Sequence, residues 1–255
     1  MKTWMKRAAA AVVVVVLALV AGPFVYINFI KDDPPDRFAL GESPPTLASP
    51  ATSAPPSTTT AGTTSADREP VPTEATTTVP VNVADGRWVV GAGSAVGYRV
   101  VEVLFGQDTE GVGRTDQISG AFTIAGTQVT DAAFEVDMAT VVSDEERRDR
   151  QFNGRLLDTA TFPTATFVLA TPIELGAVPS DGTPITATAT GDLTLRGVTN
   201  PVTFDVQAQR SGAAVQIVGS TDIVFVDYGI PNPSAPGITT QDHGLLEFDL
   251  QLSRE

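Results

Sequence analysis

The sequence predicts an all-β domain of about eight antiparallel strands with one short helix, preceded by an N-terminal membrane anchor and a polar linker. Three observations predict this fold class. From residue 85 onward, apolar and polar residues alternate in many short segments, a period that is typical of half-buried strands. Turn-forming residues recur roughly every ten to fifteen positions, and a single segment has a helical pattern. Such strands suit a closed barrel or a two-sheet sandwich.

The chain begins with a candidate transmembrane helix, which defines a first region at residues 1–30. Lys2, Lys6 and Arg7 precede an apolar run from Ala8 to Ile30, and about 20 helical residues are enough to cross a bilayer core of roughly 30 Å. The positive flank predicts a cytoplasmic N-terminus, so we expect a single-pass cell-membrane protein with an extracytoplasmic C-terminal domain. A cleaved signal peptide is the alternative, but the apolar run continues past the poor cleavage site at Ala21.

Residues 31–84 form the second predicted region, a disordered Ser/Thr/Pro-rich linker. Between Ser43 and Pro80, 24 of 38 residues are Ser, Thr or Pro, and such a segment cannot bury an apolar core. As a flexible coil it would span roughly 40 Å, and as a polyproline-like chain more than about 100 Å. We interpret it as a stalk that lifts the following domain above the membrane; a linker without a function of its own is the alternative.

The third region, residues 85–255, contains the predicted strands. They are expected at 88–90, 94–104, 118–124, 129–142, 161–175 after an initial turn, 186–195, 202–209, 213–218 and 221–226 as a pair, and 246–252. Glycine-rich and polar residues at 106–117 predict a loop, and so do the prolines and glycines of 228–244.

The single helical pattern covers Ser143 to Asp158. Ser143 and Glu146 have the spacing of a capping box, and Phe152, Leu156 and Leu157 are close enough to share one face. We therefore expect this segment to close one end of the β-structure. Its arginines, at 147, 148 and 150, are read as a solvated face paired with neighbouring acids in preference to a site for a phosphate headgroup.

The clearest strand pair is a hairpin from Gly191 to Val206. Leu193 and Leu195 alternate before the turn, as do Val202, Phe204 and Val206 after it. The six residues from Arg196 to Pro201 are predicted to form the turn, because Gly197 tolerates positive φ and proline cannot donate to a central ladder. An isolated ribbon cannot shield its apolar face, so other strands must cover it.

The residues of common catalytic and metal sites are scarce. The chain has no cysteine, and its formal charge of −14 opposes binding to nucleic acid. His243 is the one histidine, and no nucleophile-elbow motif accompanies it. The carboxylates of the C-terminal third, Asp222, Asp227, Asp242, Glu247 and Asp249, are read as residues on the outside of strands. We predict no enzyme activity and no metal site; an envelope enzyme would need Asp227, Asp242 or His243 gathered at one barrel mouth.

Four ordered motifs resemble the YceI-like family of polyisoprenoid-binding, lipocalin-like barrels. They are GDLTLRGVTNPV at 191–202, the arginines of 147–150 with Leu156 and Leu157, FPTATF at 162–167, and DYGI at 227–230. Gly120, Phe122 and Gly126 also match an early pattern of the family. One feature differs: many members have a histidine near the second strand, and the corresponding segment here, VLFGQDTEGVGR, has none. No headgroup or metal role of that histidine is carried over.

The resemblance implies an eight-stranded antiparallel lipocalin-like barrel that holds an isoprenoid, a quinone-like lipid or an acyl chain. We therefore expect a membrane-tethered barrel that binds or sequesters such a lipid without other cofactors, with the cytoplasmic membrane as a second partner and a homodimer as a candidate assembly. A stalked interaction module with a packed core is the alternative. The residues predicted to line the lipid site are Val96, Tyr98, Phe122, Phe134, Val136, Leu193, Leu195, Phe204, Val206 and Phe248.

Overall fold

A computed structural model describes residues 22, 25, 33–41, 84–104, 106–176 and 181–255. Apart from Gly22 and Val25, both helical, the predicted anchor lies outside the described residues. Most of the predicted linker also lies outside them. Among the described residues, no helix has the length and apolarity that a membrane span requires.

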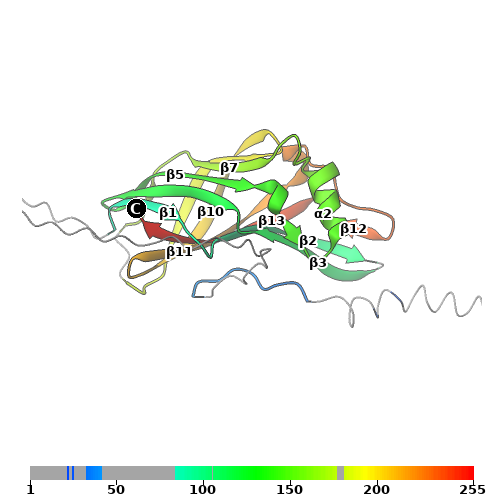
Figure 1. Cartoon of the computed structure of the whole chain (residues 1–255), viewed down its shortest axis with the longest axis horizontal. Helices are drawn as coiled ribbons and strands as arrows, with labels where there is room; N and C mark the ends of the chain where they lie inside the picture. The colour runs from blue at the N-terminus through cyan, green and yellow to red at the C-terminus, as the bar shows by residue number, and fades with distance from the viewer. Residues whose placement is uncertain (1–21, 23–24, 26–32, 42–83, 105, 177–180) are drawn as a thin grey trace, which may run out of the picture.

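Residues 84–255 fold into an elongated antiparallel barrel (Figure 1). Its long strands are β1 (Gly86–Val90), β2 (Ala95–Leu104), β3 (Gln107–Thr115), β4 (Ile118–Ala125), β5 (Gln128–Asp137), β7 (Thr164–Leu169), β9 (Ile185–Leu195), β10 (Val198–Ser211), β11 (Ala214–Val224) and β13 (His243–Arg254). Three short strands flank them: β6 (Val142–Ser143), β8 (Ile173–Glu174) and β12 (Ile238–Thr240).

The barrel wall contains eight strands once β1–β2 and β3–β4 are each counted as one bent strand. The pairs Val89–Ala121 and Val96–Thr115 belong to nearly the same antiparallel register, which makes β1–β2 and β3–β4 one long hairpin. The order continues through β5, β7, β9, β10, β11 and β13, and β13 closes the barrel by pairing with both β1 and β2. Closure pairs most of the wall on both sides, and the first half of β10 is among the parts that pair on one side only. The predicted all-β fold and its eight-stranded antiparallel barrel are confirmed.

Two predicted segments have a different secondary structure. The expected loop at 106–117 is largely β3, because its glycines allow neighbouring side chains to lie flat against the strand: a Cβ on Gly113 would come within 2.5 Å of the Tyr98 ring. The expected strand pair at 213–226 is mainly one continuous strand, β11, and 3-10 helix η4 (Phe225–Tyr228) follows it. There Gly219 makes no turn and pairs with Phe248.

The hairpin at Gly191–Val206 is present, but its turn is tighter than predicted. The turn consists of Arg196 and Gly197, with φ of 50° and 74°, as expected for a two-residue turn of the type favoured between antiparallel strands. Pro201 lies inside β10, opposite Asp192. Proline is tolerated there because this half of β10 pairs with β9 alone, while β11 joins only from Val206 onward.

The helical segment covers a gap beside β3, at one end of the barrel. Helix α2 (Glu146–Gln151) continues into a π-helical turn, η3 (Phe152–Leu156), while 3-10 helix η2 (Met138–Thr140) leads from β5 into β6. The predicted capping box is wrong: the Ser143 hydroxyl donates to Asp149 and accepts from the Glu145 amide, and α2 begins later than expected. The predicted apolar contact is confirmed, since Phe152 and Leu157 are buried together and Leu156 packs against them.

Residues 33–41, which were expected to belong to the disordered linker, lie against the outside of the barrel. This is the blue segment below the strands in Figure 1. Backbone atoms of Pro35, Asp36 and Gly41 hydrogen-bond side chains of β2, β3 and β11. Composition did not reveal these contacts, because the partner side chains come together only when the barrel closes.

Candidate functional site

The barrel encloses a cavity of about 610 Å³. Inward side chains of nearly every long strand line it, and most of them are apolar. This volume falls within the range of roughly 300–1,000 Å³ that is typical of small-molecule sites. Side chains therefore do not fill the interior completely, as they would in a packed core.

A row of aromatic rings crosses the middle of the cavity wall. Phe167, Phe204 and Phe248 come from β7, β10 and β13, and all three border the cavity. The rings of Phe167 and Phe204 are 5.4 Å apart at an interplanar angle of 60°, and those of Phe204 and Phe248 are 5.8 Å apart at 73°. These edge-to-face contacts hold the rings in fixed positions, so they form a rigid apolar surface.

All ten residues that the sequence predicted for the lipid site border this cavity. Val96, Phe122, Leu193 and Leu195 are buried, whereas the other six, which include Tyr98 and Phe248, are partly buried. The chosen register therefore points these side chains inward on every strand concerned. That they contact a lipid stays a prediction.

Other residues of the cavity wall were not among the ten. Leu246 and Leu250 continue the alternation of Phe248 on β13, so the same signal could have identified them. Met138 and Phe152 come from η2 and the start of η3. Their positions could not be read from a strand period, because the helical segment reaches the cavity only through the path of the loops that hold it.

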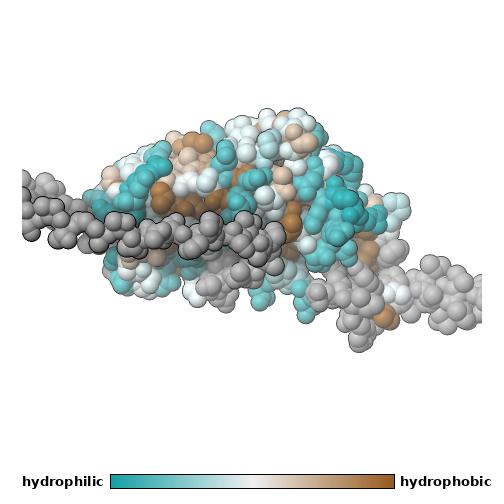
Figure 2. Space-filling model, viewed as in Figure 1, coloured by the Kyte–Doolittle hydropathy of each residue, from teal (hydrophilic) through white to brown (hydrophobic). Residues whose placement is uncertain are grey.

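The cavity becomes polar at the end that α2 covers. Glu102, Arg147 and Arg148 border it there, and Arg148 pairs with Asp144 and, at 3.8 Å, with Glu102. Figure 2 shows polar side chains gathered over α2 and apolar ones visible on the same face farther from it. Arg150 pairs with Glu146. The predicted pairing of helix arginines with acids is confirmed for Arg148 and Arg150, but the predicted solvated face is wrong for Arg148, whose side chain is only 15% exposed because it lies at the cavity.

Tyr98 connects this polar end to the apolar interior. Its ring stacks on Phe152 at 5.1 Å between centroids. Burial raises the pKa of Tyr98 well above its ordinary range, although the nearby Arg148 lowers it. Burial would lower the pKa of Arg148, but the charges of Asp144 and Glu102 raise it overall. Tyr98 is therefore neutral and Arg148 charged throughout the physiological pH range, and at this mouth Arg148 stays a cation between two acids, Glu102 and Asp144.

The acids and the histidine considered for an enzyme lie elsewhere. Asp227, Asp242 and His243 do not border the cavity. Asp242 is fully exposed and 2.8 Å from the His243 ring, whose hydrogen bond lowers the pKa of Asp242. In the part of the chain that the structure describes, no cluster of three metal-ligating side chains forms.

Two acids predicted to lie on the outside of strands are buried there. The side chains of Glu247 and Asp249 point away from the cavity, yet the residues are only 2% and 1% exposed. Glu247 lies between Arg99 and Arg114, which are themselves buried. Their burial depends on what covers the outer face of β13.

Comparisons with known proteins agree with this architecture. Residues 88–252 match the YceI-like domain. A UPF0312 protein of Shewanella denitrificans is 34% identical over 134 residues, which cover 49% of this chain and 66% of that protein. A UPF0312 protein of Vibrio parahaemolyticus is 28% identical over 128 residues, which cover 47% of this chain and 64% of that protein. The matched region thus spans a little less than two thirds of these relatives.

A solved structure shares the fold at lower sequence similarity. It is a polyisoprenoid-binding domain from Saccharophagus degradans implicated in plant cell wall breakdown, 19% identical, with a TM-score of 0.54, covering 67% of this chain and 99% of that one. The match over 88–252 includes every long strand of the barrel, although it begins within β1 and ends within β13. This chain belongs to the YceI-like family.

Proposed function

We propose that the barrel binds one long-chain lipid of the isoprenoid, quinone-like or acyl class in its cavity, without catalysis. The observation that carries the proposal is the cavity of about 610 Å³ inside the barrel, with its largely apolar wall. The likeness to a polyisoprenoid-binding domain supports the isoprenoid class.

The energetics favour a long apolar ligand. Moving each methylene from water into an apolar site contributes about 0.8 kcal/mol, so ten such groups contribute roughly 8 kcal/mol before the entropy lost on binding. The aromatic row supplies contact area without polar atoms that would need partners. A strongly polar ligand would leave its own groups without hydrogen bonds along most of this wall.

We further propose that the N-terminal apolar run holds the barrel at the outer face of the cytoplasmic membrane. The run from Ala8 to Ile30 is long enough to span a bilayer, and its flanking positive charges favour a cytoplasmic N-terminus. A lipid-binding domain at this surface is close to the pool from which long-chain lipids would be taken.

The test is native mass spectrometry of the full chain, extracted in mild detergent from a bacterial membrane, together with lipid extraction of the purified protein. We expect a long-chain lipid in near-unit ratio. A protein that is empty and takes up neither added polyprenol nor added menaquinone would contradict the proposal and favour a stalked interaction module.

A matched pair of variants on β9 localises the site. Ala189 is buried and borders the cavity, so Ala189→Phe should fill part of it and lower the amount of bound lipid. Thr186 is an exposed residue of the same strand, and Thr186→Phe adds a similar ring outside the barrel. Equal lipid content in the two folded variants would show that the lipid is bound elsewhere.

A further inference from the structure

A short extended segment crosses the outer face of the barrel far from its own position in the sequence. Residues 33–41 lie over the surface formed by β2, β3, β11 and β13 (Figure 1). We call this segment the strap. It precedes the residues that match the YceI-like domain, which begin at 88.

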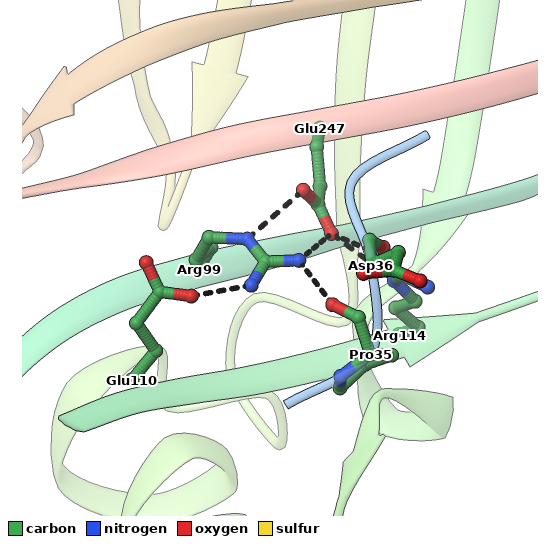
Figure 3. Close-up of polar contacts among 6 residues, drawn as sticks. All are labelled: Pro35, Asp36, Arg99, Glu110, Arg114 and Glu247. Carbon is green, nitrogen blue, oxygen red and sulfur yellow. Dashed lines mark hydrogen bonds and ion pairs between the residues drawn. The ribbon is translucent and has the colours of Figure 1, made fainter. Parts of the chain in front are cut away.

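The first half of the strap completes a buried group of charges (Figure 3). Arg99 donates to the Pro35 carbonyl oxygen at 2.7 Å, and Arg114 donates to the Asp36 carbonyl oxygen. Glu247 accepts from Arg99 at 3.3 Å and from Arg114 at 2.6 Å. Glu110 accepts from Arg99 at 2.6 Å. The charges of the two cations and two anions balance. The strap carbonyl oxygens accept hydrogen bonds from guanidinium N–H groups that would otherwise need water as a partner.

The second half of the strap is held by one ring and one amide. The Phe38 ring lies 4.0 Å from the Arg114 guanidinium, within the range of a cation–π contact. The Gln216 amide oxygen accepts from the Gly41 N–H at 2.8 Å, while its nitrogen donates to the Ala39 carbonyl at 3.3 Å and to Asp249 at 2.9 Å. The strap therefore contacts the direct partners of both buried acids, Glu247 and Asp249.

We propose that the strap fixes the barrel directly beside the end of the N-terminal apolar run, so that the chain beyond Gly41 adds no distance between the membrane and the barrel. This inference rests on the proposed membrane anchor. Ile30 and Pro35 are five residues apart, which corresponds to at most roughly 17 Å of extended chain. A spacer of the whole linker would allow roughly 40 Å or more. Ala84, where the chain enters the barrel, is buried in the core at 2% exposure, so both flanks of residues 42–83 are attached to the barrel.

The strap also gives the barrel an orientation. It runs from Arg99 on β2 toward Gln216 on β11. Beyond Arg99, β2 leads to the β2–β3 turn and Glu102, which pairs with Arg148 of α2, whereas Gln216 lies opposite Gln251 near the C-terminus. The N-terminal end of the strap therefore lies toward the α2 end of the barrel, so a membrane anchor just before the strap would turn this polar end of the cavity toward the membrane.

Limited trypsin digestion of the full chain in detergent tests the docking without membrane or ligand. Arg37 lies in the strap and Arg68 in the following segment, so each molecule carries its own reference site. We expect cleavage after Arg37 to be at least about fivefold slower than after Arg68, and the double variant Phe38→Ala, Gln216→Ala to remove this difference. Gln128→Ala, on β5, should leave it unchanged. Equal cleavage after Arg37 and Arg68 in the wild type would overturn the proposal. Protection of Arg37 that disappears on dilution would also overturn it, because the strap would then come from a second copy of the chain.

Energy transfer in vesicles tests the position beside the membrane. The chain has no cysteine, so Arg150→Cys at α2 and Thr183→Cys at the opposite end each accept a single donor dye. With acceptor dye on the lipid headgroups, we expect clearly stronger transfer from position 150, and the strap double variant should abolish the difference. Weak and equal transfer from both positions would support a spacer. If the chain fails to float with vesicles, the proposed anchor is refuted, but the trypsin result still shows whether the strap is docked. Neither assay depends on lipid in the cavity, so both are independent of the proposed lipid binding.

Discussion

Gly219 on β11 lies directly beneath the ring of Phe248 on β13. The two residues are paired across the strands, and a Cβ at position 219 would come within 2.5 Å of the Phe248 Cζ atom. Phe248 can lie against the wall only because its neighbour has no side chain. Gly191 lies under the Phe167 ring in a similar way, although Gly191 pairs with Leu169: a Cβ at position 191 would come within 2.5 Å of the Phe167 Cζ atom. These glycines let two of the three aromatic rings lie close to the wall, so the cavity beside them stays open.

Gly219→Ala should push the Phe248 ring into the cavity. We expect a loss of about 1–3 kcal/mol in the free energy of unfolding, the usual cost of overpacking, together with reduced lipid content. Urea denaturation measures the first and mass spectrometry the second. Phe248→Leu in the same chain should recover much of the stability. Gly154→Ala is the control, since its Cβ would meet open space; an equal loss there would refute the steric explanation.

Phe204→Asp should abolish lipid binding in a folded protein. Its ring contacts both Phe167 and Phe248, so a carboxylate there would place a charge in the middle of the apolar wall. We expect at least a tenfold loss of co-purified lipid, which corresponds to about 1.4 kcal/mol or more. Gln207→Asp adds the same charge at an exposed position of β10. Unchanged lipid content in folded Phe204→Asp would remove this residue from the site.

Glu247→Gln should be strongly destabilising. The substitution keeps the shape but leaves the guanidinium groups of Arg99 and Arg114 without their shared carboxylate, and breaking a buried pair in this way costs about 3–5 kcal/mol. Glu146→Gln removes an exposed ion pair with Arg150 and should change stability by no more than about 0.5 kcal/mol. Thermal and urea unfolding compare the two. A loss below about 1 kcal/mol for Glu247→Gln would mean that water screens the group.

Asp249 should make the barrel less stable as the pH rises from 4 to 7. Burial raises the pKa of Asp249 from 3.8 to about 6, although hydrogen bonds from Gln216 and Gln251 lower it. Between these values the unfolded chain ionises while the folded one keeps its proton, so stability is lost as the pH rises through the folded pKa. We expect Asp249→Asn to gain about 1–3 kcal/mol relative to the wild type over this interval. A stability difference that is independent of pH in urea titrations would contradict the shift.

The alternation of apolar residues determined most of the barrel. Val96, Phe122, Leu193 and Phe204 could be assigned to the inner face because successive side chains of a strand point to opposite sides, a property that each strand carries by itself. Every residue assigned in this way borders the cavity. Membership of the family followed from motifs that are local for the same reason.

The tertiary structure alone decided the features that depend on residues brought together across the barrel. In the sequence alone, Gly113 indicates a loop. Its place in a strand could not be read from the sequence, because it depends on the Tyr98 ring of the neighbouring strand. The docking of residues 33–41 depends on Arg99, Arg114 and Gln216, which become neighbours only through the strand pairing. The open cavity likewise depends on how far apart opposite walls stand once eight strands close. Sequence periodicity specifies the direction of each side chain, whereas these contacts and distances are set by registers between strands that are remote in the chain.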